Sequence, residues 1–157
     1  FKEGGTVTGG NSSGLNDGAS AIILMSEEKA RDRGCKPLAT VRSYCTVASD
    51  PYLVGLAPVP AIQNVLKETG LGLKDIQLFE INEAFASYYL ACEKELGLNR
   101  QITNVHGSGI SLGHPVGSTG CRILVTLLYE MERQGLNFGI SSLCAGGGVG
   151  TAILVER

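Results

Sequence analysis

The sequence has no excess of charge of one sign and no long hydrophobic run, and each absence excludes a class of protein. Charged residues make up 18% of the 157 residues and the formal net charge is −2. No basic stripe can therefore follow a phosphate backbone, and we expect no nucleic-acid partner. The longest apolar runs, 21–25 and 122–129, are far shorter than the roughly 20 residues of a membrane-spanning helix. We expect no membrane partner either.

Residues for metal and disulfide chemistry are also scarce. The five cysteines are widely spaced without a C-x-x-C pair, and only two histidines are present. We therefore expect reduced thiols and no metal site. The first residues lack the pattern of a secretory signal, which predicts a cytoplasmic location. The chain also begins without methionine, and we expect it to be a piece of a longer polypeptide.

The hydrophobic pattern alternates between strand-like and helix-like segments. Asn82 is expected to cap one of the helices, with Glu83 in its first turn. Three consecutive glycines separate the last two strand-like runs, which indicates a hairpin. This order predicts an α/β fold with a mixed sheet covered by helices on both faces. The expected strands are 17–25, 37–47, 75–81, 103–106, 138–145 and 149–156, and the expected helices are 27–33, 60–69 from Pro60, the segment from Asn82 to Gly97, and a longest helix with Ile123, Leu127, Leu128 and Met131 on one stripe.

Glycine is the residue in excess, with 22 copies clustered mainly at 107–120 and 146–150. The loop 113–120 precedes a helix and could bind an anion, but it lacks the Lys-Ser/Thr pair of a phosphate-binding P-loop. The loop 107–113 has the spacing G-x-G-x-x-x-G, and no acidic strand end follows about 20 residues later. Neither loop predicts a nucleotide site.

Three polar residues follow predicted strands and could meet at one edge of the sheet: Asn82, His114 and Cys144. Each has an ordinary structural explanation, as a helix cap, a loop hydrogen bond and a small core residue. Together they allow chemistry, because a thiol beside backbone amides and an imidazole can be held as a thiolate that acts as base or nucleophile. Glycines after the thiol would admit substrate and free N–H groups for an oxyanion.

Four spaced motifs decide between these possibilities. The chain reads "GNSSGLNDGA" at 10–19, "NEAFA" at 82–86, "GHPVGSTG" at 113–120 and "CAGGGVG" at 144–150. In this order they closely resemble the motif series of the thiolases, the acetyl-CoA acetyltransferase family. The resemblance implies a thiolase-like fold of two similar α/β halves with the active site between them. Residues 1–26 would end the N-terminal half and residues 27–157 would form the C-terminal domain.

The same resemblance implies the reaction and the site residues. Thiolases condense two acyl-CoA units or cleave 3-ketoacyl-CoA, using an acylated cysteine in the N-terminal half that no cysteine here matches, so this chain is expected to be inactive alone. The implied substrate is a coenzyme A thioester, with no tightly bound cofactor, and the whole protein would be a homo-oligomer, a dimer or tetramer. A non-catalytic module that binds acyl-CoA or lipid is the alternative, and a purely structural or interaction domain is a third reading. The implied roles are Cys144 as acid/base, His114 activating the nucleophile and donating to the thioester oxygen, Asn82 holding a water in the same oxyanion hole, the backbone N–H of Gly146 in a second hole, and Ser13, Ala84 and Phe85 lining the coenzyme A tunnel.

Overall fold

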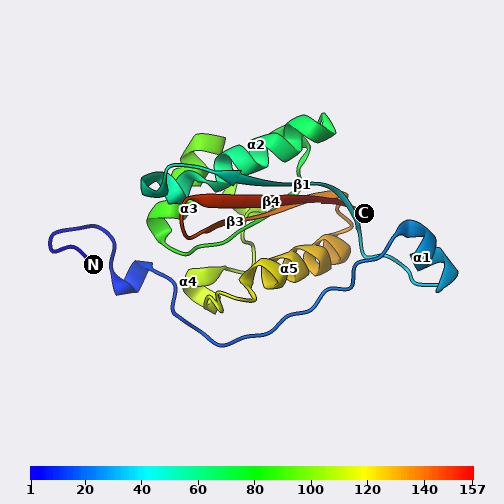
Figure 1. The fold of residues 1–157 in the computed structure, drawn as a ribbon, viewed down its shortest axis with the longest axis horizontal. Helices are drawn as coiled ribbons and strands as arrows, with labels where there is room; N and C mark the ends of the chain where they lie inside the picture. Colours follow the sequence, from blue (N-terminus) through cyan, green and yellow to red (C-terminus); the bar gives the residue numbers. More distant parts are fainter.

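The computed structural model describes residues 1–157, and a four-stranded mixed sheet lies at its centre (Figure 1). The strand order is β1-β4-β3-β2. β2 pairs in parallel with β3, whereas the other two pairings are antiparallel. The predicted hairpin is confirmed, because β3 and β4 are consecutive and separated only by Gly146 to Gly148. The strands are β1 (Thr40–Ala48), β2 (Leu78–Ile81), β3 (Phe138–Ala145) and β4 (Val149–Glu156).

Helices cover both faces of this sheet, as predicted. α2 packs on β1, β3 and β4, while α5 packs on β2 and β3 from the other side, and Figure 1 shows α2 and α3 above the sheet and α5 below it. Ser26 caps α1 by accepting a hydrogen bond from the backbone of Lys29. The helices are α1 (Glu27–Asp32), α2 (Pro58–Thr69), α3 (Ala86–Leu96), α4 (Gly109–Leu112) and α5 (Thr119–Gln134), with 3-10 turns η1 (Gly9–Asn11), η2 (Pro51–Leu56), η3 (Leu73–Asp75) and η4 (Arg100–Ile102).

The core has two parts, one on each side of the sheet. The larger cluster joins α2 to Phe79, Ile81, Ile140 and Leu154, and the smaller joins α5 to Leu78. The predicted apolar stripe of the longest helix is confirmed, because all four of its residues are buried in α5. Side chains alternate along β2, so its odd-numbered residues face α2 and its even-numbered residues face α5. None of the helices combines the length and apolarity that crossing a bilayer requires.

The N-terminal segment departs most from the sequence expectation. Residues 17–25 form no strand, and they run extended past α5 (Figure 1). Ile23 and Leu24 leave 82% and 75% of their surface exposed. An apolar run becomes a strand only where a neighbour completes its hydrogen bonds, and none of the four strands pairs with this segment. The predicted strand 17–25 is therefore wrong for this chain.

Several other boundaries differ from the predicted ones: β1 begins at Thr40 and not at residue 37, and β2 begins at Leu78 and not at residue 75, where a 3-10 turn ends. α2 begins at Pro58 and not at Pro60, since Pro58 already supplies the fixed φ that suits a first helical position. The predicted strand 103–106 reduces to one bridge between Thr103 and Phe79. Asn104 follows with φ of +50°, which ends the extended backbone.

Candidate active site

Asn82 is not a helix cap, contrary to the expectation. α3 begins only at Ala86, and its N-cap residue is Phe85, which makes no side-chain cap. The backbone N–H of Asn82 instead donates to the carbonyl of Ser142 on β3, at 3.0 Å. The Asn82 side chain is 4% exposed, and its Nδ2 lies 3.4 Å from Nε2 of His114. Asn82 thus extends β2 by one residue and places its amide against the histidine.

His114 is held from its other ring nitrogen by Thr119. Nδ1 of His114 lies 2.6 Å from Oγ1 of Thr119, and this hydroxyl donates its only proton to the carbonyl of Pro115 at 3.0 Å. Nδ2 of Asn82 can only donate, so Nε2 of His114 accepts from it and the proton of the neutral ring lies on Nδ1, where Oγ1 of Thr119 accepts it. The lone pair of Nε2 accepts the hydrogen bond from Asn82. A neutral imidazole with Nε2 unprotonated is a proton acceptor.

The N-terminal segment fixes the backbone of the histidine loop. The N–H of His114 donates to Oδ1 of Asn16 at 3.0 Å, and Leu15 forms a parallel bridge with His114. Burial lowers the pKa of His114, and the charge of Arg122 lowers this pKa further. Both effects favour the neutral ring near pH 7. Sequence reasoning missed Asn16 and Thr119, although a Thr five residues after a loop histidine, at a helix start, is a usable signal.

Cys144 is the second-last residue of β3 and is half-buried. It shares a face of the strand with Ile140, the face toward α2 and α3. No hydrogen bond joins its thiol to His114 or Asn82. Burial raises the pKa of the Cys144 thiol. Burial also raises the pKa of Cys92 on α3 to about 12, and the charge of the nearby Cys144 adds to this second shift. The raised pKa of Cys144 favours the protonated thiol in the chain alone, and the expected role of Cys144 as a thiolate base stays a prediction.

The glycines after Cys144 fall into two groups. Gly146 and Gly147 are exposed, and a Cβ on either would meet no atom within 4 Å. A Cβ on Gly148 or Gly150 would lie 2.2 Å and 2.1 Å from backbone oxygens of Ser49 and Ala57. The first pair leaves open space beside the thiol, as expected. The absence of a side chain at Gly148 and Gly150 makes room for the chain's own segment 49–57, and not for substrate.

The three residues expected along a coenzyme A tunnel do come together. The backbone N–H of Ser13 donates to the carbonyl of Ala84 at 2.9 Å, and Ser12 forms an antiparallel bridge with Phe85. The Phe85 ring packs edge-on against Tyr88, with 4.8 Å between ring centroids. The N-terminal segment therefore lies directly beside the 82–86 motif.

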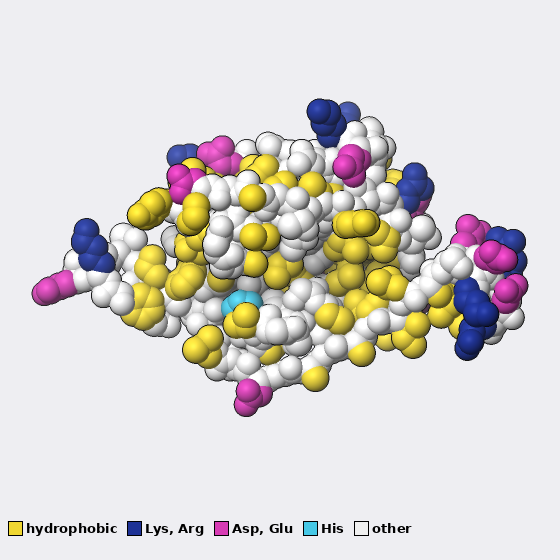
Figure 2. Space-filling model, viewed as in Figure 1, with side chains coloured by type: hydrophobic (Ala, Val, Ile, Leu, Met, Phe, Trp, Pro, Cys, Tyr) yellow, Lys and Arg dark blue, Asp and Glu magenta, His cyan; other side chains and the backbone are white.

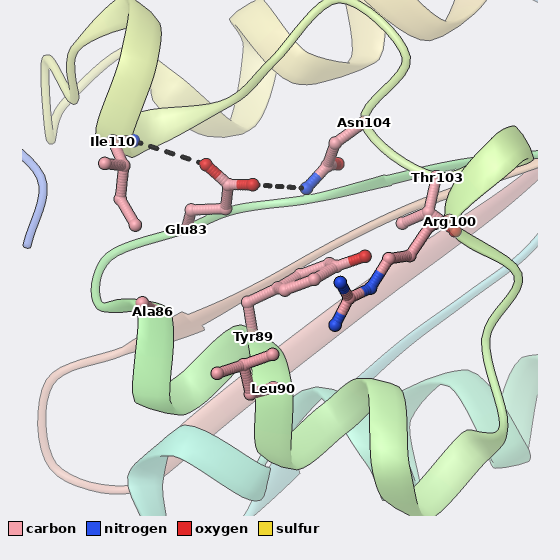
Figure 3. A pocket seen from close by; sticks show the side chains of 8 residues that line it. All are labelled: Glu83, Ala86, Tyr89, Leu90, Arg100, Thr103, Asn104 and Ile110. Atoms are coloured by element: carbon pink, nitrogen blue, oxygen red, sulfur yellow. Dashed lines mark hydrogen bonds between the residues drawn. The ribbon is translucent and has the colours of Figure 1, made fainter. Parts of the chain in front are cut away.

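Glu83 lies outside the first turn of α3, and its carboxylate is hydrogen-bonded to the segment that follows η4 (Figure 3). Its carboxylate accepts from Nδ2 of Asn104 at 3.3 Å and from the N–H of Ile110 at 3.4 Å. Asn104 in turn exchanges two hydrogen bonds with the backbone of Ile81. Figure 3 shows Glu83, Asn104 and Ile110 among the residues that line a cavity of about 320 Å³. Nowhere in the chain do three or more His, Cys, Asp or Glu side chains form a potential metal site.

Comparison with known families decides the relationship. Residues 35–157 match the family described as "Thiolase, C-terminal domain", and residues 1–28 match "Thiolase, N-terminal domain". The chain belongs to the thiolase family. Its motifs at 82–86, 113–120 and 144–150 thus lie within the thiolase C-terminal domain.

Individual thiolases are similar over the whole chain. An acetyl-CoA acetyltransferase of Chromobacterium violaceum is 50% identical over 157 residues, 100% of this chain and 40% of the relative. The structure of the Bacillus anthracis acetyl-CoA acetyltransferase has a TM-score of 0.97 and 52% identity, covering 99% of this chain and 40% of the other. Human mitochondrial 3-ketoacyl-CoA thiolase in complex with CoA has a TM-score of 0.98 and 46% identity, covering 100% and 40%. The chain spans about 40% of the length of the curated relatives that it matches.

The α5 side of the sheet in this thiolase domain has an open apolar groove. A cavity of about 830 Å³ lies between residues 20–24, α5 and strands β1 and β4, and Figure 2 shows hydrophobic side chains along the hollow between the sheet and the N-terminal segment. Tyr44 on β1 is 75% exposed beside it. A soluble monomer seldom exposes a large contiguous apolar surface, so such a groove indicates a contact surface.

Proposed function

We propose that this chain is the C-terminal part of an enzyme that condenses two acetyl-CoA units or cleaves 3-ketoacyl-CoA with coenzyme A. The observation that carries the proposal is the hydrogen-bonded series Asn82, His114 and Thr119, which joins segments far apart in the sequence. It leaves one imidazole nitrogen unprotonated at a loop beyond the end of β2. About 50% identity to acetyl-CoA acetyltransferases over the full chain supports the same reaction.

In the proposed reaction His114 activates a cysteine nucleophile supplied by the N-terminal half. Nε2 takes the thiol proton, and the resulting imidazolium can donate that proton to the oxygen of a bound thioester as negative charge develops there. Asn82 would share this oxyanion hole. Its buried Oδ1 has no protein partner, so it can accept a hydrogen bond from a water held beside the histidine.

Cys144 is the proposed acid/base. The buried thiol is protonated at rest, so it can give its proton to the coenzyme A sulfur that departs when the nucleophile is acylated. The thiolate left behind then takes the α-proton of the second acetyl-CoA, and the same burial that raises the pKa of Cys144 makes this thiolate a stronger base. Gly146, exposed in the turn after it, would supply a backbone N–H to the oxyanion of the acyl-enzyme.

Coenzyme A would reach this site beside the N-terminal segment. Ser13, Ala84 and Phe85 form one continuous surface there, and the human relative with a TM-score of 0.98 binds CoA according to its description. We assign the pantetheine arm to this surface. No tightly bound cofactor is part of the proposal.

The domain division and the quaternary state are also proposals. Family matches at 1–28 and 35–157 support a division in which 1–26 ends the N-terminal half and 27–157 is the C-terminal domain. The apolar groove beside Tyr44 supports docking of the rest of that N-terminal half. The chain alone would be inactive without the acylated cysteine, and the whole protein would be a homo-oligomer. The expected cytoplasmic location stays a prediction, since one similar enzyme is mitochondrial by its description.

The test begins with the intact mass of the native gene product, expected at about 40 kDa because the 16.4 kDa chain spans 40% of its relatives. Thiolysis of acetoacetyl-CoA is then measured on that whole protein. Cys144→Ala should lower kcat by about 10²–10⁴-fold, as loss of an acid/base group does, whereas Cys35→Ala, which removes an exposed thiol, should leave it unchanged. Wild-type turnover in Cys144→Ala would refute the mechanism. Tight binding of acetyl-CoA without any turnover would favour the non-catalytic alternative.

A further inference from the structure

Two ionisable residues with buried polar atoms, Glu80 and Arg122, stand close along the chain to the two partners of His114. Glu80 precedes Asn82 by two residues on β2, so both side chains point to the α5 side of the sheet. Arg122 follows Thr119 by three residues on α5, so these two share a face of the helix. The proposed reaction assigns a role to neither Glu80 nor Arg122.

Both side chains end in buried polar atoms that have no hydrogen-bond partner from the protein. Glu80 is 0% exposed, and neither of its carboxyl oxygens is hydrogen-bonded. Nη1 and Nη2 of Arg122 are also buried and unpaired, as is Oγ of Ser118 at the start of the same helix. Buried charges are normally paired because desolvation is costly. Because water does not reach the buried guanidinium nitrogens, the positive charge of Arg122 acts on neighbouring groups with little screening.

The charge balance in this region favours a net positive field at His114. Burial raises the pKa of Glu80 to about 8, although Arg122 opposes this, and Glu83 and Glu130 act in the same direction as burial. Near pH 7 the Glu80 carboxyl is thus largely neutral and does not compensate Arg122. Burial lowers the pKa of His114, and the positive charge of Arg122 lowers it in the same direction.

We propose that Arg122 is a positioning residue for His114: its buried guanidinium, left uncompensated by Glu80, keeps the imidazole neutral with the proton on Nδ1 and Nε2 unprotonated. Thr119 orients the ring by accepting from Nδ1, and Arg122 one turn along the same helix face makes a second proton on the ring unfavourable. The catalytic consequence rests on the proposed function, whereas the state of the ring does not.

Nuclear magnetic resonance of ¹⁵N-labelled histidine in this chain tests the inference directly, because only two histidines are present. Arg122→Met should move the His114 titration to higher pH, and Arg122→Lys, which keeps the charge, should return it toward wild type. Arg133→Met removes a largely exposed arginine from the same helix and should leave His114 unaffected. A folded Arg122→Met chain with the wild-type titration overturns the proposal.

A second variant keeps the test decisive if Arg122→Met fails to fold. Glu80→Gln preserves the shape of a neutral carboxyl, so below pH 7 it should leave the His114 titration unchanged. A shift of that titration to lower pH would mean that Glu80 is ionised and compensates Arg122, and this result also overturns the proposal.

Kinetics of the whole protein separate this inference from the proposed function. Arg122→Met should shift the acidic limb of the kcat pH profile to higher pH with KM for the thioester retained, because the imidazole base then protonates at higher pH, and Arg122→Lys should reverse part of this shift. An inactive wild-type protein would refute the proposed function and leave the magnetic resonance result standing. Loss of turnover in Arg122→Met with an unchanged His114 titration would refute the positioning role alone.

Discussion

Gly150→Ala should destabilise the chain strongly, because Gly150 lies against the backbone at the start of α2. A Cβ there would sit 2.1 Å from the carbonyl oxygen and 2.3 Å from the carbonyl carbon of Ala57. Ordinary contact begins at 3.4 Å, so the two segments must separate by more than an ångström. Ala57 is fully buried and precedes a helix, so it cannot rotate away as a flexible side chain could. Overpacking of this kind costs about 1–3 kcal/mol, and a rigid backbone neighbour puts this case at the upper end.

Urea unfolding followed by circular dichroism measures this effect. A loss of about 3 kcal/mol is a large part of the roughly 5–15 kcal/mol that stabilises a typical domain, and it corresponds to about 6–12 °C in Tm for a chain of this size. The matched control is Gly146→Ala in the same glycine run, where a Cβ meets nothing within 4 Å and the change should stay within about 0.5 kcal/mol. Equal unfolding midpoints for the two variants would refute the close-packing argument.

Three further predictions follow from the site and its surroundings. Thr119→Val keeps the shape of the side chain but removes the acceptor for Nδ1 of His114, so urea unfolding should show a loss of about 1–3 kcal/mol; an unchanged midpoint would mean that the bond does not hold the ring. Hydrogen bonds, first of all from Arg133, lower the pKa of Glu130 in the folded chain. The ionised carboxylate therefore stabilises the folded state above the unfolded pKa of about 4.3, and this stabilisation is lost as the pH falls from there toward the folded pKa. The stability difference between wild type and Glu130→Gln should therefore shrink from pH 6 to pH 3, and a constant difference would contradict this. Among the five thiols, exposed Cys35 should react early with iodoacetamide and Cys92, with a pKa of about 12, should react last, as peptide mass mapping can show; early modification of Cys92 in folded protein would contradict its burial.

Much of the fold can be predicted from local sequence signals. Ser26 accepts the cap hydrogen bond that its residue type predicts, and Gly97 ends α3 with a positive φ that favours glycine. The three glycines at 146–148 mark a hairpin, because they free the backbone for a tight reversal between two apolar runs. Each of these outcomes depends on residues only a few positions apart, so one sequence is enough to predict it.

The candidate site is only partly predictable in the same way. The motifs at 82–86, 113–120 and 144–150 name Asn82, His114 and Cys144 as residues of interest. Whether Asn82 caps a helix or meets an imidazole depends on where β2 ends relative to the histidine loop, and this is set by the packing of α5 on the sheet. The tautomer of His114 depends on Thr119, and local periodicity carries no information on that contact.

The sequence by itself therefore determined the family, the α/β class, the hairpin and the helix stripe that fills the α5 side of the core. Only the tertiary structure decided that the apolar run 17–25 has no strand partner in this chain and that Gly148 and Gly150 serve the chain's own loop. It also decided that burial raises the pKa of Cys144 and that the guanidinium nitrogens of Arg122 are buried on the α5 face that carries Thr119. The physical reason is common to all four: strand pairing, close approach, desolvation and electrostatic coupling depend on distances between segments that are remote in sequence.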